Sequence, residues 1–84
     1  MIANNASDLG AILRDARRAK RMSQQGLAEA IGVTRQWVIG AERGAPTARI
    51  DLMLTALRQT DMLVDVVKDE SQGLLDAVLG DSHG

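Results

Sequence analysis

The chain has 84 residues, which is enough for one hydrophobic core and therefore for one domain. It contains no cysteine, which excludes disulfide bonds and thiolate metal sites and is typical of cytoplasmic proteins. Trp37 is the only aromatic residue, which disfavours modules that stack single-stranded nucleic acid on aromatic rings.

Neither a secretion signal nor a membrane span is expected. Residues 1–6 lack a basic stretch followed by an apolar run, and nowhere do about eighteen apolar residues follow one another. We therefore expect a cytoplasmic protein with a disordered N-terminus over 1–6.

Charge is unevenly distributed, although the formal net charge is only −1. The stretch from Arg14 to Arg49 contains eight basic and three acidic residues, whereas the remainder contains two basic and eight acidic residues. The basic stretch suits a polyanion such as duplex DNA, and the acidic C-terminal part is expected to face away from it. The alternative is a chance scatter of surface charge.

The first predicted helix covers residues 8–20. Leu9, Ile12, Leu13 and Ala16 follow the spacing that lines one helix face, and Ser7 is the expected N-cap. A second stripe on this helix is a charged ridge, which is either functional or simply solvated. The ridge consists of Arg14, Arg17, Arg18 and Arg21.

Two short helices are predicted next, over 24–31 and 35–43. Ser23 and Thr34 are the expected N-caps, while Gly32 and Gly44 are placed to end the helices. The residues expected to face inward are Leu27, Ala28, Ile31, Val38 and Ala41.

A fourth helix is expected from a cap at Thr47 to about Gln59 or Thr60. Its predicted inward face consists of Ile50, Met53, Leu54 and Leu57.

Residues 62–67 follow, and their β-branched composition predicts a strand. No second strand is apparent, so pairing with another copy of the chain across a two-fold axis is the economical way to satisfy its backbone. The alternative is that residues 62–67 form the last turns of the fourth helix or a loop on the core. The side chains assigned to dimerisation are Met62, Leu63, Val64 and Val66.

The predicted organisation is a folded domain over 7–68 followed by an acidic flexible tail over 69–84. The tail contains a short apolar patch, residues 74–79, and is too short to fold alone. Docking of this patch as a helix on a protein partner is the alternative to disorder.

The pair of short helices meets the requirements of a helix-turn-helix. A small residue, Ala28, stands where the two helices cross; Gly32 allows the turn, Val33 plugs it, and Val38 anchors the second helix. A generic helical hairpin meets these four constraints only occasionally.

Residues 23–44, SQQGLAEAIGVTRQWVIGAERG, resemble the Cro and phage-repressor superfamily. More narrowly, the Arg35-Gln36-Trp37 opening, Glu42-Arg43-Gly44 and the residues 63–66 resemble HipB-type antitoxins and Y4mF-like regulators. The resemblance implies an all-α fold with four to five helices, similar to the lambda repressor, and a C-terminal strand that pairs between protomers.

The resemblance also implies roles in DNA recognition. Arg35 and Gln36 are expected to read bases, because arginine can donate two parallel hydrogen bonds to guanine and glutamine can both donate to and accept from adenine. Ile39 offers only apolar contact to a thymine methyl. The superfamily more often has a polar residue at the position of Ile39. Phosphate contacts are expected from Gln24, Thr34, Arg43 and Arg18, although solvated arginines are the alternative for the last two.

Arg17 and Glu42 correspond to the superfamily pair that ties the first helix to the recognition helix, so both are expected to be structural. Trp37 is expected to pack over the second helix, the alternative being a backbone contact through its indole N–H. Gly40 is consistent with close approach to DNA.

These observations predict a homodimeric, sequence-specific repressor that binds a palindromic duplex operator, with no cofactor or metal. Within this class, a HipB-like antitoxin would also neutralise a HipA-like kinase toxin and repress its own operon, whereas a phage-type or chromosomal regulator would act alone. A protein-interaction module without DNA binding is the second class. An enzyme is disfavoured because the single histidine, His83, lies in the tail and the carboxylates are scattered.

Overall fold

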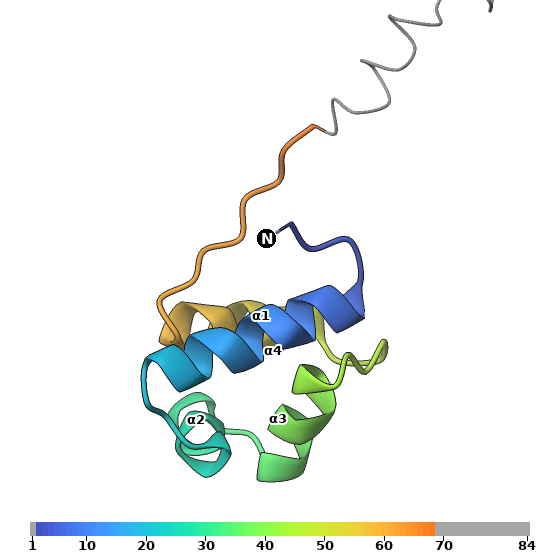
Figure 1. Cartoon of the computed structure of the whole chain (residues 1–84). Coiled ribbons are helices and arrows are strands. Elements are labelled where there is room, and N and C mark those ends of the chain that lie inside the picture. Colours follow the sequence, from blue (N-terminus) through green and yellow to red (C-terminus); the bar gives the residue numbers. More distant parts are fainter. Residues whose placement is uncertain (1, 69–84) are drawn as a thin grey trace, which may run out of the picture.

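A computed structural model of the chain describes residues 2–68. This part contains four helices: α1 (Ala6–Ala19), α2 (Gln24–Ile31), α3 (Arg35–Glu42) and α4 (Ile50–Gln59). α1 and α4 lie across one side of the molecule, and α2 and α3 lie below them (Figure 1). α1 contacts α3 and α4, and α2 contacts the same two helices. The expected all-helical class is confirmed for the described residues.

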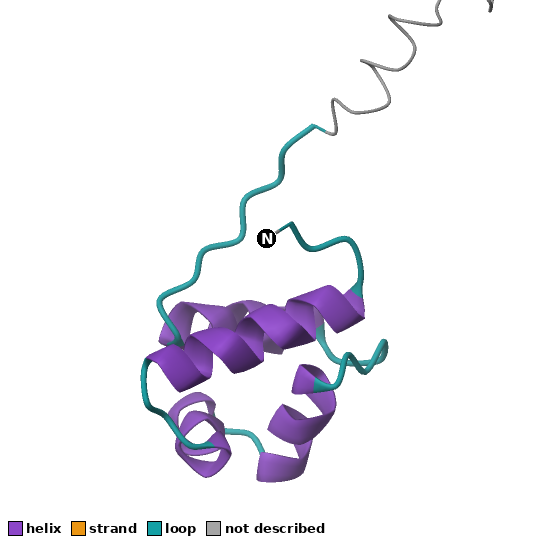
Figure 2. Cartoon of the chain, in the orientation of Figure 1, coloured by secondary structure: helices purple, strands orange, loops and turns teal. Residues whose placement is uncertain are grey.

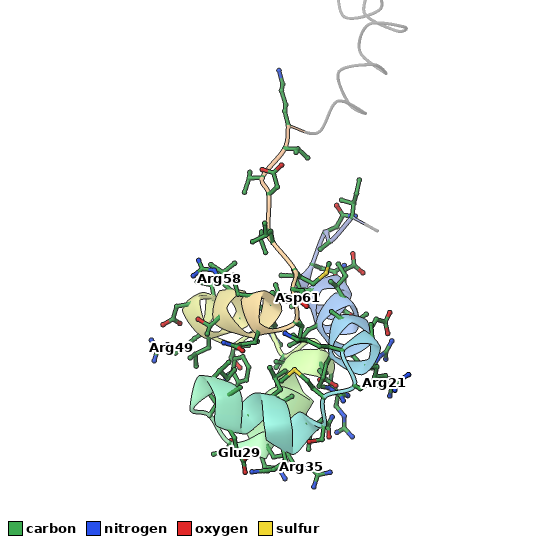
Figure 3. The ribbon with its side chains drawn as sticks, turned by 90° about the vertical axis from the view of Figure 1, so that its left-hand side faces the viewer. Arg21, Glu29, Arg35, Arg49, Arg58 and Asp61 are labelled. Atoms are coloured by element: carbon green, nitrogen blue, oxygen red, sulfur yellow. The ribbon has the colours of Figure 1, made fainter. Side chains whose placement is uncertain are left out.

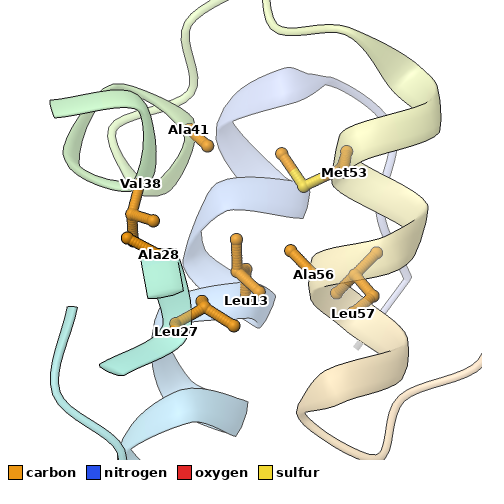
Figure 4. Packing of buried hydrophobic residues seen from close by; sticks show 8 residues of the cluster. All are labelled: Leu13, Leu27, Ala28, Val38, Ala41, Met53, Ala56 and Leu57. Carbon is orange, nitrogen blue, oxygen red and sulfur yellow. The ribbon is translucent and has the colours of Figure 1, made fainter. Parts of the chain in front are cut away.

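The core lies where the four helices meet, and every helix contributes to it (Figure 4). The predicted inward residues of α1, α2 and α3 are largely confirmed, because Leu13, Leu27 and Val38 are fully buried. Smaller side chains allow the helices to approach closely. The complete buried set is Leu13, Leu27, Ala28, Val38, Ala41, Met53, Ala56 and Leu57.

α1 begins earlier than the sequence pattern predicts. Its N-cap is Asn5, whose side chain accepts a hydrogen bond from the Asp8 backbone N–H at 2.8 Å. The expectation of Ser7 as the cap is wrong, because Ser7 already lies within the first turn of the helix. There its backbone meets the Cα of Gly44, where an added Cβ would lie 2.6 Å from Ser7 Cα.

α1 and the end of α3 approach closely at two glycines, Gly44 and Gly10. Gly44 has a φ of 85°, as its predicted position after α3 requires. Gly10, one turn into α1, faces the end of α3, and a Cβ there would lie 2.4 Å from the Ala41 carbonyl oxygen. The first half of α1 therefore rests directly on the last backbone turn of α3.

α4 differs from the prediction in its start and in its buried face. It begins after Arg49, which has no capping side-chain bond, so Thr47 is not the cap. Met53 and Leu57 are buried as predicted, but Ala56 joins them, and the expectation that Ile50 and Leu54 face inward is wrong. The helix turns its small residue toward the closely packed core and leaves 63% of Ile50 exposed.

The helix ends of α1 and α4 are tied together. Lys20 donates from Nζ to the Gln59 carbonyl oxygen at 2.8 Å and to Asp61 Oδ1 at 3.3 Å. The Thr60 hydroxyl, which is buried, donates to the Leu57 carbonyl oxygen and closes α4 near the predicted residue.

Residues 62–68 form no strand and no helix in this single chain, and they lead away from the four helices (Figure 2). The alternative that they continue α4 is therefore wrong. A strand needs a partner for its backbone groups, and one copy of the described chain offers none, so pairing between protomers stays a prediction. The predicted tail over 69–84 lies outside the described residues.

Candidate functional site

The segment from α2 to α3 is built by local interactions that the sequence specifies. Ser23 Oγ accepts from the Gly26 N–H at 2.8 Å, and Thr34 Oγ1 accepts from the Trp37 N–H at 3.1 Å. Gly32 ends α2 in the left-handed conformation, with a φ of 73°. Both helices are therefore capped and separated by a tight turn, as predicted.

The turn is packed against the core from within. Val33 donates from its backbone N–H to the Ala28 carbonyl oxygen at 2.9 Å, and its side chain is partly buried against the core. Trp37 is also half-buried and packs on the core cluster. The opposite face of α3 is not needed for this packing and is exposed to solvent at its start.

That outward face begins with Arg35 and Gln36, which are both exposed, and continues with the half-buried Ile39. Arg35 lies at the end of the molecule opposite to the segment 62–68 (Figure 3). Because Val38 and Ala41 hold the inner face in the core, the backbone of α3 cannot rotate to hide these side chains. The outward face of α3 thus presents a guanidinium group, an amide and an apolar side chain together on one short helix.

A buried ion pair holds α3 against α1. Arg17 donates from Nε to Glu42 Oε2 at 2.6 Å and from Nη2 to Glu42 Oε1 at 3.0 Å. Its third donor, Nη1, bonds the Met22 carbonyl oxygen at 2.8 Å in the connection to α2. One side chain thereby joins two helices and a loop, and the hydrogen bonds that Arg17 donates to Glu42 raise the pKa of the Arg17 guanidinium above its ordinary value.

Gln24 at the start of α2 takes part in the same network. Its Nε2 donates to Glu42 Oε1 at 3.3 Å, so the side chain is directed toward the gap between α1 and α3. The carboxylate of Glu42 is therefore bonded by both Arg17 and Gln24.

A hollow of about 360 Å³ opens beside this network, between α1, the start of α2 and the outward face of α3. Four of its lining residues are arginines, and we call it the arginine hollow. It is lined by Arg14, Arg18, Gln24, Arg35, Ile39, Glu42 and Arg43.

The arginine hollow brings together five of the predicted DNA contacts from three separate helices and adjoining residues. These are Gln24, Arg35, Ile39, Arg43 and Arg18. Two others, Gln36 and Thr34, do not line it; Gln36 is exposed on α3, and Thr34 uses its hydroxyl as a cap. Arg14 also lines the hollow, and its only signal in the sequence was its position in the charged ridge of the first helix.

Other basic residues lie apart from this hollow. Arg49 and Arg58 lie on the α4 side of the molecule, whereas Arg21 lies on the α1 side (Figure 3). Arg49 donates from Nε to Asp51 Oδ1 at 3.0 Å, and this bond lowers the pKa of the Asp51 carboxyl. The basic stretch of the sequence is thus divided between two faces.

The side chains assigned to dimerisation are open to solvent in the single chain. Leu63 and Val66 are 85% and 91% exposed, and Met62 and Val64 are also exposed. Together with Met53, Leu57 and Ile50, several of them border a groove of about 1200 Å³ between the two ends of the described chain.

Residues 2–68 contain neither a membrane-spanning helix nor a metal-binding cluster. No helix among residues 2–68 is long and apolar enough to cross a membrane. Over the same residues, no group of three or more histidine, cysteine, aspartate or glutamate side chains is placed to hold a metal ion.

Comparison with known proteins gives two matches. A family model described as a helix-turn-helix domain matches residues 8–66, from the first turn of α1 into the segment after α4. The chain is 31% identical over 61 residues to a protein of Sinorhizobium fredii named as an uncharacterized HTH-type transcriptional regulator, y4mF. That alignment covers 73% of this chain and 80% of the relative.

Proposed function

Because the chain belongs to the helix-turn-helix family, we propose that it is a transcriptional repressor that binds double-stranded DNA at a specific sequence. The observation that carries this proposal is the outward face of α3, which presents Arg35, Gln36 and Ile39 beside a hollow lined by arginines. Its proposed place of action is the nucleoid in the bacterial cytoplasm. The proposed function includes no enzymatic activity.

Base recognition is assigned to α3 in the major groove. Arg35 donates its two parallel N–H groups to guanine O6 and N7, and Gln36 both donates to and accepts from adenine. Ile39 lies one turn further on and contacts a thymine methyl. The packing of α3 against the core supports this assignment, because a rigid helix presents these groups in one fixed order.

Phosphate contacts position the helix on the duplex. We assign these to Gln24, Thr34, Arg43 and Arg18, which surround α3 on the sides of α2 and α1. Gln24 needs only to exchange its bond to Glu42 for a phosphate, or to keep it and use its second amide hydrogen. The capping hydroxyl of Thr34 contributes at the start of α3.

The proposed active form is a homodimer paired through residues 62–67. Two observations support it: these residues have no partner within the described chain, and Ile50 and Leu54 of α4 are exposed apolar side chains that a second copy can cover. To enter successive major grooves on one face of the duplex, the two copies of α3 need to lie about 34 Å apart, one turn of DNA, and the two-fold symmetry of the dimer requires a palindromic operator.

Two versions of this function differ in their partners. The stand-alone regulator is supported by the name of the relative, which mentions transcriptional regulation only. The antitoxin version, with a HipA-like kinase as toxin, is supported by the resemblance of residues 35–44 and 63–66. Co-expression with the product of a neighbouring kinase-like gene tests it: co-purification and restored cell growth support the antitoxin, and their absence supports the stand-alone regulator.

The main test is the substitution Arg35→Ala, measured on an operator selected from random duplex oligonucleotides. We expect the affinity to fall about 5- to 150-fold, which corresponds to about 1–3 kcal/mol, and selectivity to relax at one base pair. Arg58→Ala is the matched control, since it removes an exposed arginine from the α4 side of the molecule. Unchanged operator binding by Arg35→Ala would contradict the assignment of α3 as the reading helix.

A further inference from the structure

We propose that the arginine hollow binds one phosphate group of the DNA backbone, and that Arg14 of α1 is a further DNA contact. This inference rests on the proposed function, since it assumes that α3 enters the major groove. It extends the DNA-binding surface from the helix-turn-helix to the first helix.

The first argument is convergence. Arg14 and Arg18 lie one helical turn apart on α1, and Arg35 and Arg43 lie at opposite ends of α3, yet all four line the same hollow. Three of them, Arg18, Arg35 and Arg43, form no ion pair with any other residue between 2 and 68. Their guanidinium groups are available to an external anion.

The second argument concerns the one acidic residue in the lining. Glu42 would repel an anion if its charge were uncompensated, but Arg17 binds both of its oxygens and Gln24 donates to one of them. The positive charge of Arg17 offsets that of the carboxylate. The four lining arginines therefore dominate the charge of the hollow.

The third argument is the cost of this arrangement in the free protein. Positive side chains four residues apart on a helix repel each other, as Arg14 and Arg18 do here. Arg14 has one compensating contact, from its Nε to Asp15 Oδ1 at 3.3 Å, and both side chains of that pair are solvent-exposed. Such exposed pairs are weak, so a phosphate oxygen can replace Asp15, and it also relieves the repulsion.

The position of the hollow indicates which phosphate it receives. Arg35 and Ile39 belong both to its wall and to the outward face of α3. A phosphate held there lies beside the groove that α3 enters, on the side toward α1. Duplex DNA is therefore the assigned source, and free inorganic phosphate is the other source of the same chemistry.

The test measures duplex affinity as a function of salt concentration for Arg14→Gln, Arg18→Gln and Arg14→Lys. Arg21→Gln is the matched control, because Arg21 belongs to the same ridge but does not line the hollow. Because the hollow holds a single phosphate, each glutamine variant is expected to reduce the slope of log affinity against log salt by up to about 0.9, equivalent to up to about fivefold weaker binding at 0.15 M salt. The glutamine variants should show this loss equally on operator and unrelated duplexes, and Arg14→Lys should restore it.

The outcomes separate this inference from the proposed function. If Arg14→Gln and Arg18→Gln keep the wild-type slope while Arg35→Ala loses selectivity, the hollow holds no DNA phosphate and the reading role of α3 stands. If the wild-type protein binds no duplex at any salt concentration, both proposals fail.

A second measurement addresses free anions and folding. Titration with inorganic phosphate, followed through the Arg14 side-chain NMR signals, is expected to give only millimolar affinity. Submillimolar binding combined with wild-type duplex affinity in Arg14→Gln would assign the hollow to a free anion and overturn the proposal. Thermal unfolding should show no loss of stability in any variant, because the replaced side chains are partly or fully exposed.

Discussion

Gly10 and Gly40 are both glycines inside helices, but their surroundings differ. An added Cβ at Gly10 would lie 2.4 Å from the Ala41 carbonyl oxygen and 2.7 Å from that of Glu42. These are backbone atoms and cannot rotate away. At Gly40 the nearest atom is the Ala45 Cβ at 3.9 Å, an ordinary contact.

Gly10→Ala and Gly40→Ala should therefore change stability in opposite directions. We expect Gly10→Ala to lower the free energy of unfolding by about 1–3 kcal/mol, because α1 must move away from α3. Gly40→Ala should raise it by about 0.5–1 kcal/mol through helix propensity. Urea denaturation measures both changes, and equal effects of the two substitutions would contradict the close approach at Gly10.

Gly40→Ala also reports on function at no cost to the fold. Nothing within the described chain requires glycine at this position, so the protein gains stability if it is replaced. Reduced operator affinity in the stabilised variant would support close approach of the α3 backbone to DNA, as the sequence suggested for Gly40. Gly26 has a different setting: its Cβ would lie 3.1 Å from the capping Ser23 Oγ.

At the scale of elements, the Arg17–Glu42 pair determines how α1 and α3 fit together. Both side chains are nearly fully buried, so removing one leaves the other charge without its partner. We expect Glu42→Ala to lower the free energy of unfolding by about 3 kcal/mol, toward the lower end for buried pairs because Glu42 also borders the open hollow.

A double-mutant cycle with Arg17→Met and Glu42→Ala tests this assignment by chemical denaturation. The double variant should lose less stability than the sum of the single variants, because it leaves no unpaired buried charge. Additive losses would show that the two side chains do not stabilise the fold as a pair. Because the pKa of Arg17 is raised in the folded protein, the contribution of its charge to stability is present below its ordinary pKa and falls as the pH rises through the raised, strongly alkaline pKa.

The recognition elements were predictable from sequence, and α4 was less so. Caps and left-handed glycines act over three or four residues, so Ser23, Gly32 and Thr34 predicted the bounds of α2 and the start of α3 directly. In α4 two overlapping apolar stripes were available, and periodicity favoured the one with more large side chains. The core instead accepted Ala56, because the distance between packed helices limits the size of the side chain.

At the scale of the whole molecule, the segment after α4 and the exposed side of α4 form the interface of the proposed dimer. Val64→Pro removes one backbone N–H from the proposed ribbon, so we expect weaker association and weaker operator binding. Val64→Thr is the matched control, since it keeps both the N–H and the β-branched shape. Sedimentation velocity and operator titration measure the two effects; a monomeric wild-type protein, or a dissociated variant with full operator affinity, would contradict the dimer.

The sequence by itself determined that the four helices exist, although not where α1 and α4 begin. It also determined the turn between α2 and α3 and which side chains of α3 face outward. These features depend on neighbours within one or two turns, and the sequence contains all of those neighbours. The candidate base-reading residues Arg35 and Gln36 belong to this group because they follow from the buried positions of Val38 and Ala41 on the same short helix.

Only the tertiary structure decided where Arg14 of α1 lies, although the resemblance had already paired Arg17 with Glu42. The charged ridge of α1 was compatible with a solvated face, and its spacing alone could not distinguish Arg17, which is buried against Glu42, from Arg14 and Arg18, which line the hollow. The difference arises from how α1 packs on α3, where the close contacts at Gly10 and Gly44 and the Arg17–Glu42 ion pair join them. Contacts between residues 25 or more positions apart depend on three-dimensional packing, which helical periodicity does not encode.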